Sequence, residues 1–560
     1  IGDKLDALAF QPFAGVDVAG VEALALSARS DRYHVKAIKP LPRRKLYEKV
    51  PLMDCFTAPC KGGCPIRQDI PEYIELCRKG QYASALRLIT EKNPLPFITG
   101  TICAHNCMTK CMRNYYDEPV NIRATKLVAA EKGYDAYMSK ITPPAPVTDG
   151  RKVAVIGGGP TGMSAAYFVG RAGIPVTLFE KADRLGGIVR QVIPAFRISD
   201  EAIDKDVALM EKMGVEVKLN TEAPSVAELK AQGYTHIFFA VGAWKAGRLD
   251  IPGNVVPVIG WLRDMKAGKD VSLGHVAVVG GGNTAMDAAR AALRAGAKSS
   301  TLVYRRTKKY MPADAEELEM AIADGVEFLE LVAPVEQKDG KLICEKMKLG
   351  DPDDKGRRKP VPTGEMVEIP CDTVVSAVGE KVESEVFTRN GITVDEKGIP
   401  AFKTNLERVY AGGDAMRGPA TVVEGIADAQ YFANAVIGEA HRFAIPAKAV
   451  ATREEAVAKK GVLCESAKCE GDRCLTCNVV CQVCADVCPN RANVVIELPD
   501  GRQQILHVDR MCNECGNCAV FCPYDSAPYR EKFTLFLTRE GFDESVNNQG
   551  FLPLGGKTVL

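Results

Sequence analysis

The twenty cysteines of this 560-residue chain are gathered at its two ends. Seven lie between Cys55 and Cys111 and eleven between Cys464 and Cys522, whereas only Cys344 and Cys371 lie in the long middle. Disulfides are typical of secreted proteins, and the sequence shows no secretory signal. Clustered cysteines at short spacings therefore indicate metal or iron-sulfur ligands at both ends, and the two central cysteines are expected to be inert thiols.

The C-terminal cysteine field contains two runs that each end in Cys-Pro. The second run has the spacing C-x2-C-x2-C-x3-C-P, which is typical of ferredoxins with two 4Fe-4S clusters, where the fourth cysteine of a run binds the other cluster. The first run has one extra residue in its first gap, so Cys474 is an alternative first ligand, and Cys464 and Cys469 stay unassigned. A zinc ribbon is the other interpretation, but it needs no interlocked runs. The predicted ligand sets are Cys512, Cys515, Cys518 and Cys488 for one cluster, and Cys477, Cys481, Cys484 and Cys522 for the other.

The N-terminal cysteine field has two groups of thiols separated by a helical pattern over residues 70–91. This arrangement predicts a small helical domain around iron-sulfur clusters, with tetrahedral zinc as the alternative. Cys77 lies inside the helical pattern and is typical of an ordinary buried thiol. The six candidate ligands are Cys55, Cys60, Cys64, Cys103, Cys107 and Cys111.

A glycine-rich turn follows the apolar run 152–156. Gly157, Gly159 and Gly162 have GxGxxG spacing, and the helix that starts near Pro160 would direct its free N–H groups at a pyrophosphate. A second apolar strand over 176–179 ends in Glu180, a carboxylate that can accept hydrogen bonds from ribose hydroxyls, and Gly187 closes the stretch. Strand, turn, helix, strand and terminal acid in this order predict a dinucleotide site rather than a simple turn.

A second nucleotide motif lies near the middle of the chain. A strand over 275–279 precedes Gly280, Gly282 and Ala285, with Asn283 and Thr284 opening the next helix. The following strand ends in Arg305 and Arg306, where the first motif has its acid. Guanidinium groups can bind a 2'-phosphate through paired charged hydrogen bonds, so NADPH is favoured over NADH. A solvated basic turn is the alternative, because two lysines follow closely.

A third turn points to a flavin. The strand-like VYAGGD at 409–414 ends in Gly413 and Asp414, and a helical segment follows. Paired with the first glycine motif, this turn predicts a site for FAD, with Asp414 near the ribityl and pyrophosphate groups. No cysteine lies between Cys111 and Cys344, so no redox disulfide is available beside the flavin. Electrons must then leave through clusters or go directly to a substrate.

Composition excludes several classes of protein. Lys plus Arg number 72 and Asp plus Glu number 71, so a net charge of +1 gives no reason to expect nucleic acid or an anionic membrane surface. No apolar run approaches the roughly 18 residues of a membrane span. We expect a cytoplasmic, multi-domain globular protein. The chain begins at Ile1 rather than Met, so we expect that an upstream part is missing.

These motifs resemble a known family over residues 50–440. DCFTAPCKGGCP, NPLPFITGTIC and the paired glycine motifs are similar to the small subunit of glutamate synthase, the N-terminal half of dihydropyrimidine dehydrogenase and the large subunit of NADH-dependent ferredoxin:NADP oxidoreductase. The resemblance implies one N-terminal cluster on Cys55, Cys60 and Cys111 and another on Cys64, Cys103 and Cys107. Each set lacks one ligand, because Leu52 stands where the family has Cys and Lys126 where it has Gln or Glu.

With the C-terminal ferredoxin-like field added, the chain resembles in particular the iron-sulfur subunit of a bacterial protein named as a selenate reductase. That resemblance implies an electron-transfer subunit of a hetero-oligomer whose partner is a molybdenum hydroxylase-type subunit or a ferredoxin. We predict hydride exchange between NADPH and FAD, with single electrons passing through 4Fe-4S clusters. The alternatives are a self-contained NADPH-dependent reductase of a small molecule, and a non-catalytic iron-sulfur scaffold.

The predicted fold is multi-domain α/β, with two Rossmann-like domains between a helical iron-sulfur domain and a C-terminal ferredoxin-like α+β domain. The expected boundaries are an N-terminal segment at 1–50, the helical iron-sulfur domain at 51–145, the FAD domain at 151–265 and 371–445, the inserted NADPH domain at 266–370, the ferredoxin-like domain at 462–535 and a tail at 536–560.

Overall fold

The computed structural model describes residues 17–30, 44–49, 57–271, 273–353, 357–499, 503–546, 549–556 and 558–559. Leu52 and the predicted ligand Cys55 lie outside these ranges. The chain forms two compact units. The first contains residues 273–374 with 251–254 and the N-terminal 42 residues, among which is helix α2 (Val18–Ser30). The second contains residues 43–250, 255–272 and 375–560.

The helical part of the second unit begins after residue 57. Gly80, with φ +71°, ends the first long helix and divides the helical pattern predicted over 70–91 into two helices, because few residues other than glycine adopt that backbone conformation. Its elements are α3 (Pro59–Gly62), α4 (Ile70–Arg78), α5 (Tyr82–Thr90), α6 (Pro96–Ile102), α7 (Asn106–Thr109), the 3-10 helix η2 (Met112–Tyr115) and α8 (Ile122–Met138).

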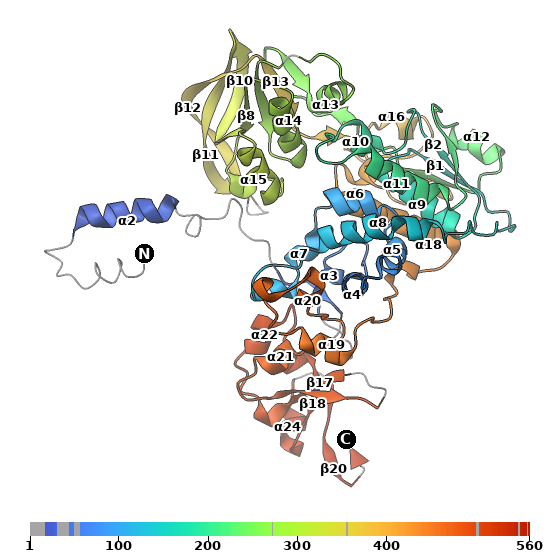
Figure 1. Cartoon of the computed structure of the whole chain (residues 1–560), viewed down its shortest axis with the longest axis vertical. Helices are drawn as coiled ribbons and strands as arrows, with labels where there is room; N and C mark the ends of the chain where they lie inside the picture. The colour runs from blue at the N-terminus through green and yellow to red at the C-terminus, as the bar shows by residue number, and fades with distance from the viewer. Residues whose placement is uncertain are drawn as a thin grey trace. The chain divides into compact units, whose positions relative to one another are not determined.

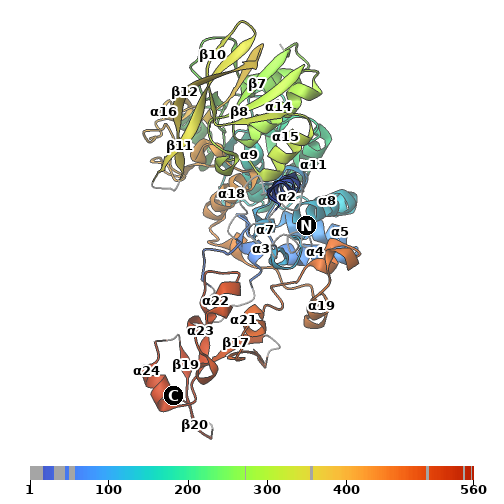
Figure 2. The ribbon, with the colours of Figure 1, turned by 90° about the vertical axis from the view of Figure 1, so that its left-hand side faces the viewer.

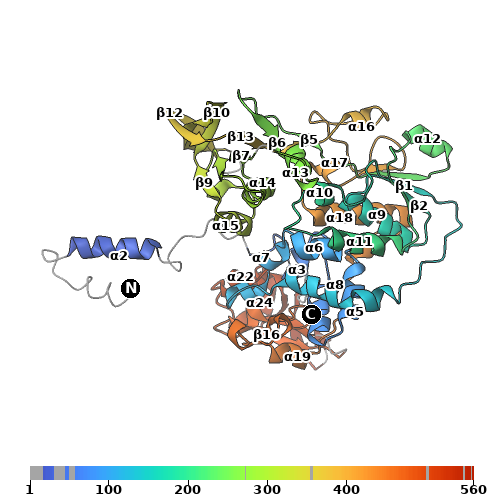
Figure 3. The ribbon, with the colours of Figure 1, turned by 45° about the horizontal axis from the view of Figure 1, so that its top comes forward.

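A parallel five-stranded sheet follows in the same unit, in the order β15-β4-β1-β2-β3. The buried, β-branched and aromatic strands are typical of a parallel sheet covered on both faces. Helices α9 and α18 lie side by side against this sheet (Figures 1 and 3). The elements are β1 (Val153–Ile156), α9 (Pro160–Arg171), β2 (Val176–Phe179), α10 (Gly187–Gln191), α11 (Asp200–Glu211), β3 (Glu216–Lys218), α12 (Val226–Ala231), β4 (His236–Phe239), α16 (Glu385–Thr388), β15 (Val409–Ala411), α17 (Asp414–Arg417), α18 (Val422–Ile437) and η4 (Arg442–Ala444). A two-stranded sheet pairs β5 (Lys245–Ala246) with β14 (Glu380–Lys381).

A second five-stranded sheet has the order β6-β13-β7-β8-β9. An antiparallel sheet of β10, β11 and β12 follows β9 in the chain, and Figure 2 shows its three strands side by side. The elements are β6 (Val255–Pro257), α13 (Val258–Lys266), β7 (His275–Gly280), α14 (Asn283–Arg294), β8 (Ser299–Tyr304), η3 (Lys308–Tyr310), α15 (Ala315–Ala323), β9 (Glu327–Glu330), β10 (Val332–Lys338), β11 (Lys341–Pro352), β12 (Arg358–Pro370) and β13 (Thr373–Ala377).

The C-terminal part of the second unit is α+β, with a sheet in the order β16-β17-β18-β19. The predicted tail contributes to it, because β19 pairs in parallel with β18. The elements are α19 (Arg453–Ala458), η5 (Cys464–Ser466), α20 (Glu470–Arg473), α21 (Val483–Asp486), β16 (Asn493–Glu497), β17 (Gln503–Val508), η6 (Asp509–Met511), α22 (Asn517–Phe521), α23 (Pro528–Glu531), β18 (Phe533–Leu535), α24 (Arg539–Glu544), β19 (Gly550–Phe551), β20 (Pro553–Gly555) and β21 (Thr558–Val559).

Candidate redox sites

The first glycine motif forms a tight turn between β1 and α9. Gly157 has φ +104°, and a Cβ on Gly162 would overlap the carbonyl oxygen of Gly157. Gly159 caps α9 and faces Gly187, where an added Cβ would stand 2.9 Å from the Gly159 Cα. The backbone segments of this turn therefore lie too close together for side chains. No side chain caps the N–H groups in the first turn of α9.

Glu180 lies at the end of β2, as the motif predicts for a ribose-binding acid. Its Oε2 accepts a hydrogen bond from the Gly158 N–H at 2.6 Å, and its Oε1 accepts one from the Ala182 N–H at 2.8 Å. The residue is 7% exposed. The carboxylate is thus fixed against the glycine turn, where it can also accept from a ligand hydroxyl.

The AGGD turn meets the same helix. A Cβ on Gly413 or on Gly425 would overlap the Thr161 hydroxyl at the start of α9, so the turn and α18 approach α9 more closely than other residues permit. Asp428 Oδ2 accepts from the Gly413 N–H at 2.9 Å, and the same carboxylate binds the Arg417 guanidinium through two hydrogen bonds. Sequence reasoning missed this buried Asp428, which holds the turn in place.

Asp414 follows Gly413 and opens α17. Burial raises the pKa of its carboxyl to about 7, although the Ala420 N–H donates to its Oδ1 at 3.1 Å and acts in the opposite sense. Helix α18 begins beyond it with a capping box, in which Thr421 and Glu424 satisfy each other's backbone N–H groups. The two turns that are predicted to bind FAD, at residues 157–162 and 411–414, therefore meet at one edge of a single sheet.

The second nucleotide motif is built in the first unit. Gly282 caps α14 with open space around its Cα, whereas a Cβ on Gly281 would overlap the ring of Tyr304 on β8. Asn283 Oδ1 accepts from the Asp314 N–H at 3.0 Å, Thr284 is partly exposed beside it, and Ala285, in the third glycine position, is fully buried.

The basic end of β8 is more extensive than the sequence indicates. Arg305 is exposed, and Arg306 Nε donates to the Arg358 carbonyl at 3.3 Å. Burial raises the pKa of Tyr304, and the guanidinium groups of Arg306, Arg305 and Arg357 oppose that rise. Arg357 therefore stands near the predicted pair although it lies more than fifty residues away in sequence, so no local pattern could have found it.

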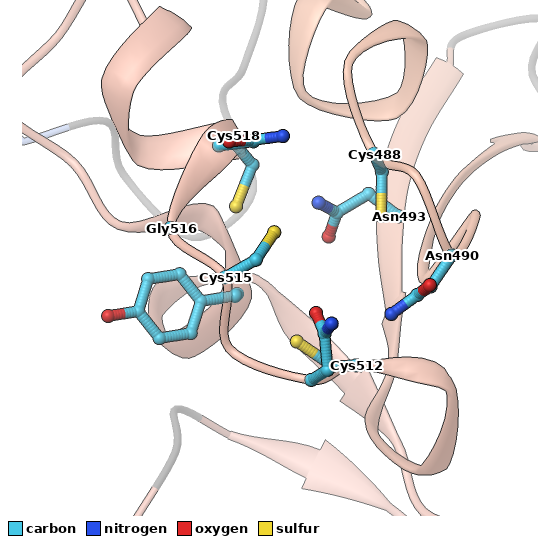
Figure 4. Close-up of a pocket in the computed structure, with 10 residues that line it drawn as sticks. Cys488, Asn490, Asn493, Cys512, Cys515, Gly516 and Cys518 are labelled. Carbon is cyan, nitrogen blue, oxygen red and sulfur yellow. The ribbon is translucent and has the colours of Figure 1, made fainter.

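Four cysteines of the C-terminal field surround one pocket. Cys512, Cys515 and Cys518 line it together with Cys488, which is the set predicted from the crossed ferredoxin pattern. Figure 4 shows their sulfur atoms turned toward a common space. Two of these sulfurs accept backbone hydrogen bonds, Cys488 from the Ala492 N–H at 3.1 Å and Cys512 from the Glu514 N–H at 3.3 Å.

In the other predicted C-terminal set, burial raises the pKa of Cys477, and the thiol of Cys481, from the same set, raises it further. Cys484 and Cys522 are buried and Cys481 is partly exposed. Cys522 packs with Leu46 and Tyr524, which lie in neighbouring backbone segments joined by a parallel bridge. Cys477 also lines a different pocket, which contains two of the N-terminal thiols.

Among the N-terminal thiols, Cys64, Cys103 and Cys107 form one group. Burial raises the pKa of Cys64 and of Cys107, and further rises come from the neighbouring thiols of the same group. Lys126, only 7% exposed, opposes those rises, so its ammonium lies close to these thiols at the position where the resemblance places a ligand. A cation here can compensate thiolate charge but cannot bind iron while it is protonated.

Cys60 and Cys111 belong to a different pocket, together with Cys474 and Cys477 from the C-terminal field. Burial is the largest cause of the raised pKa of Cys60, and the thiols of Cys111, Cys474 and Cys477 raise it further. Four neighbouring thiols that disfavour each other's ionisation are stable as thiolates only with a compensating cation or cluster. The sequence offered Cys474 only as a substitute within the C-terminal field.

Of the remaining thiols, Cys344 and Cys371 are buried, Cys77 is partly exposed, and Cys464 and Cys469 are exposed. Burial raises the pKa of Cys344 to about 12 and of Cys371 to about 11, so both stay protonated and unreactive at neutral pH. Cys77 on α4 has its pKa raised to about 11 by burial. Across the ranges that the structure describes, no group of three or more His, Cys, Asp or Glu is compact enough for a single metal ion. Likewise, none of the described helices is both long and apolar enough to cross a bilayer.

Two family models match the chain. The model of pyridine nucleotide-disulphide oxidoreductases matches residues 151–429, and that of dihydropyrimidine dehydrogenase domain II, a 4Fe-4S cluster domain, matches residues 48–136. The fold and sites thus define a flavin- and pyridine-nucleotide-dependent oxidoreductase with iron-sulfur domains. The chain belongs to the family of the small chain of NADPH-dependent glutamate synthase, since it is 32% identical to that of Halomonas elongata over 67% of this chain and 86% of the relative.

Two longer relatives extend the likeness. The protein YgfK of Escherichia coli strain K12, which is named as an oxidoreductase, is 42% identical over 96% of this chain and 54% of its own length. A Moorella thermoacetica protein, the beta subunit of an NADP-dependent formate dehydrogenase, is 36% identical over 66% of this chain and 58% of its own length. The chain therefore spans about half the length of these relatives. The family matches confirm the predicted resemblance, the fold class and the cofactors FAD, NADPH and 4Fe-4S clusters.

Proposed function

We propose that the chain is an NADPH-linked electron-transfer subunit, which exchanges hydride between NADPH and FAD and passes single electrons through 4Fe-4S clusters to or from a partner protein. The observation that carries the proposal is the combination, in one chain, of two glycine-rich dinucleotide turns with two pockets that are each lined by four cysteines, and no cysteine between Cys111 and Cys344. A bound flavin would supply the conversion between two-electron and one-electron transfer.

The residues of the first motif would bind FAD by its phosphates and ribose. The N–H groups at the start of α9, behind Gly157, Gly159, Pro160 and Gly162, provide an anion site, and Gly187 leaves room beside them. Glu180 would accept from the ribose hydroxyls. Gly413 brings the AGGD turn against α9, and Asp414, whose pKa of about 7 lets it carry a proton, can donate to or accept from the ribityl chain.

The residues of the second motif would bind NADPH. Gly280, Gly282, Asn283 and Thr284 form the turn and first residues of α14, which present free N–H groups to a pyrophosphate. Arg305 and Arg306 would bind the 2'-phosphate, and Arg357 adds a third cation near the same strand end.

For the clusters, the set with the most support is Cys488, Cys512, Cys515 and Cys518, because all four line one pocket and two of the sulfurs already accept N–H groups. Cys64, Cys103 and Cys107 form a further candidate set beside Lys126. The names of the relatives, which include a beta subunit of a formate dehydrogenase, support a partner in a hetero-oligomer. The partner that we propose is a molybdenum hydroxylase-type subunit or a ferredoxin.

An anaerobic titration of the reconstituted full-length protein tests the proposal. NADPH should bleach the flavin absorbance and then the broad cluster absorbance, and NADH should do so only at higher concentration. Affinity capture under the same conditions should then retain the partner. A flavin that NADPH does not reduce would contradict the proposal and favour a scaffold. Turnover of a small substrate by the isolated chain would instead favour a self-contained reductase.

A further inference from the structure

The pocket that contains Cys60 and Cys111 is built from both ends of the sequence. Cys60 lies on α3 and Cys111 directly before η2, whereas Cys474 and Cys477 follow α20, beyond the whole flavin-binding part. Apart from Arg113 and Thr476, the side chains of the rest of the lining are apolar, with Ile70, Ile74 and Val120 among them. No carboxylate, amide or imidazole side chain lines it. A donor set of soft thiolates in a dry shell is suited to an iron-sulfur cluster.

The segment that carries Cys474 is firmly attached to the helical part. Cys474 belongs to the same buried apolar cluster as Ile70, Tyr73 and Ile74 of α4. A Cβ on Gly471 would stand 2.6 Å from the Cβ of Arg78, so α20 packs directly on α4. Cys474 is therefore a core residue of the helical part, although it is distant in sequence.

Buried polar contacts fix the same segment on both sides of Cys474. Lys459 forms an ion pair with Glu75, whose side chain is 1% exposed. Arg473, 3% exposed, donates to the Glu118 carbonyl at 2.7 Å. Asn478 donates to Glu72 at 2.6 Å. Because buried charges are costly unless paired, these contacts specify one position for the segment and hold both thiols at the pocket.

We propose that Cys60, Cys111, Cys474 and Cys477 bind one 4Fe-4S cluster, which joins the N-terminal helical part to the beginning of the C-terminal cysteine field. The type of cluster in this inference, 4Fe-4S, rests on the proposed function. The inference takes Cys477 from the set predicted with Cys481, Cys484 and Cys522, and makes Cys474 a ligand of the N-terminal part. These two thiols take the place of Cys55, which the resemblance groups with Cys60 and Cys111 and which lies outside the described residues. Zinc is the alternative for four cysteine ligands, and the metal content of the purified protein distinguishes the two.

The test compares four full-length proteins purified anaerobically: the unaltered chain, Cys474→Ala, Cys477→Ala and the control Cys469→Ala. Cys469 is exposed and lies only five residues before Cys474. Iron, sulfide, zinc and FAD are measured per chain, together with the electron paramagnetic resonance spectrum after dithionite reduction. Cys474→Ala and Cys477→Ala should each lose about four iron atoms per chain and one reduced-cluster signal, or lose about one iron and gain a three-iron signal. Cys469→Ala should match the unaltered chain.

A full complement of iron and signals in either Cys474→Ala or Cys477→Ala would overturn the proposal, as would one equivalent of zinc in the unaltered chain that either substitution removes. FAD content and far-ultraviolet circular dichroism check folding, and Cys474→Ser replaces Cys474→Ala if the alanine variant does not fold. Reduction of FAD by NADPH in the variants tests the proposed function separately, because the flavin turns use none of these four cysteines. The two proposals can therefore fail independently.

Discussion

Arg305 stands exposed at the end of β8, where the equivalent position of the first nucleotide motif is the acid Glu180. This single difference of charge is what separates a site for a free ribose hydroxyl from one for a 2'-phosphate. The positions of both residues at strand ends were predictable from sequence, and their roles in binding a nucleotide stay predictions. The position of Arg357 was not predictable, because its place beside Tyr304 depends on the β11–β12 hairpin.

Replacing Arg305 should change the choice of nucleotide. Arg305→Gln removes one charged hydrogen bond to a 2'-phosphate, so we expect the KM for NADPH to rise about tenfold, which corresponds to about 1.4 kcal/mol, with little change in the KM for NADH. Anaerobic dye-reduction kinetics with both nucleotides measure this. Lys309→Gln, which removes an exposed cation from the same turn, is the control. Equal losses for the two nucleotides would show that Arg305 does not bind the phosphate.

The partly buried carboxyl of Asp414 predicts a pH dependence of stability. Its pKa of about 7 in the fold lies above the ordinary value, because burial disfavours the charged form. The folded state therefore binds more protons than the unfolded state between about pH 4 and pH 7, and Asp414 lowers stability as pH rises through that window. Asp414→Asn should flatten the fall in Tm of the flavin-free protein between pH 5 and 8. Asp183→Asn, at an exposed carboxylate, should leave the slope of Tm against pH unchanged. An unchanged slope in Asp414→Asn would show that the pKa of Asp414 is ordinary.

At the scale of elements, helix α9 and its turn illustrate what sequence patterns predict well. Gly157, Gly159 and Gly162 act within one strand-turn-helix unit, so their roles follow from local geometry. The helical pattern over 70–91 shows the limit, because Gly80 divides it into α4 and α5. Contacts between elements that are distant in the chain, such as the packing of α20 on α4, produce no periodic pattern in the sequence. The grouping of Cys474 with Cys60 was therefore not predictable from the sequence.

The close approach at Gly162 gives a direct test of the FAD site. In Gly162→Ala the new methyl group would overlap the Gly157 carbonyl oxygen, so the turn must open and its N–H groups move. We expect FAD to bind at least about tenfold more weakly. Titration of the desalted, flavin-free protein with FAD, followed by flavin fluorescence, measures this affinity. Gly260→Ala is the matched control, since Gly260 lies in α13 with open space around it. Normal FAD affinity in Gly162→Ala would place the dinucleotide elsewhere.

The ion pair between Lys459 and Glu75 gives a test of how the C-terminal segment is attached. Burial alone would raise the pKa of Glu75, but Arg78 and Lys459 lower it to about 2. Lys459→Met leaves this buried carboxylate with less compensation, and we expect the attachment to weaken by about 3 kcal/mol. Faster amide hydrogen exchange over residues 459–478 would show it. Lys460→Met, at a more exposed neighbour, should not change that exchange.

At the scale of the whole molecule, the two compact units differ in their content of candidate ligands. The first unit holds only the unreactive Cys344 and Cys371, whereas all described candidate cluster ligands lie in the second. The fold class followed from the order of the motifs. The part of the second unit that residues from both ends of the chain form together was not predictable from sequence, because it depends on buried contacts such as that of Arg473 with Glu118.

Removal of iron should therefore affect the two units differently. Buried thiols that lose a cluster keep their desolvation cost without its ligand bonds, so the helical part should unfold at lower temperature. The first unit should keep its transition, since it contains no cluster ligand. Hydrogen exchange of chelator-treated and untreated protein, followed during heating, measures both. A matching shift in residues 273–374 would indicate that the clusters stabilise the whole chain.

The packing of α20 on α4 also has a consequence for biogenesis. During synthesis Cys60 and Cys111 leave the ribosome long before Cys474 and Cys477, and the flavin-binding sheet is completed between them. The four-thiol pocket thus exists only after synthesis has passed Cys477. Iron delivery to the pocket must follow the synthesis of Cys477, and a product truncated before Cys474 would carry only two of the four thiols.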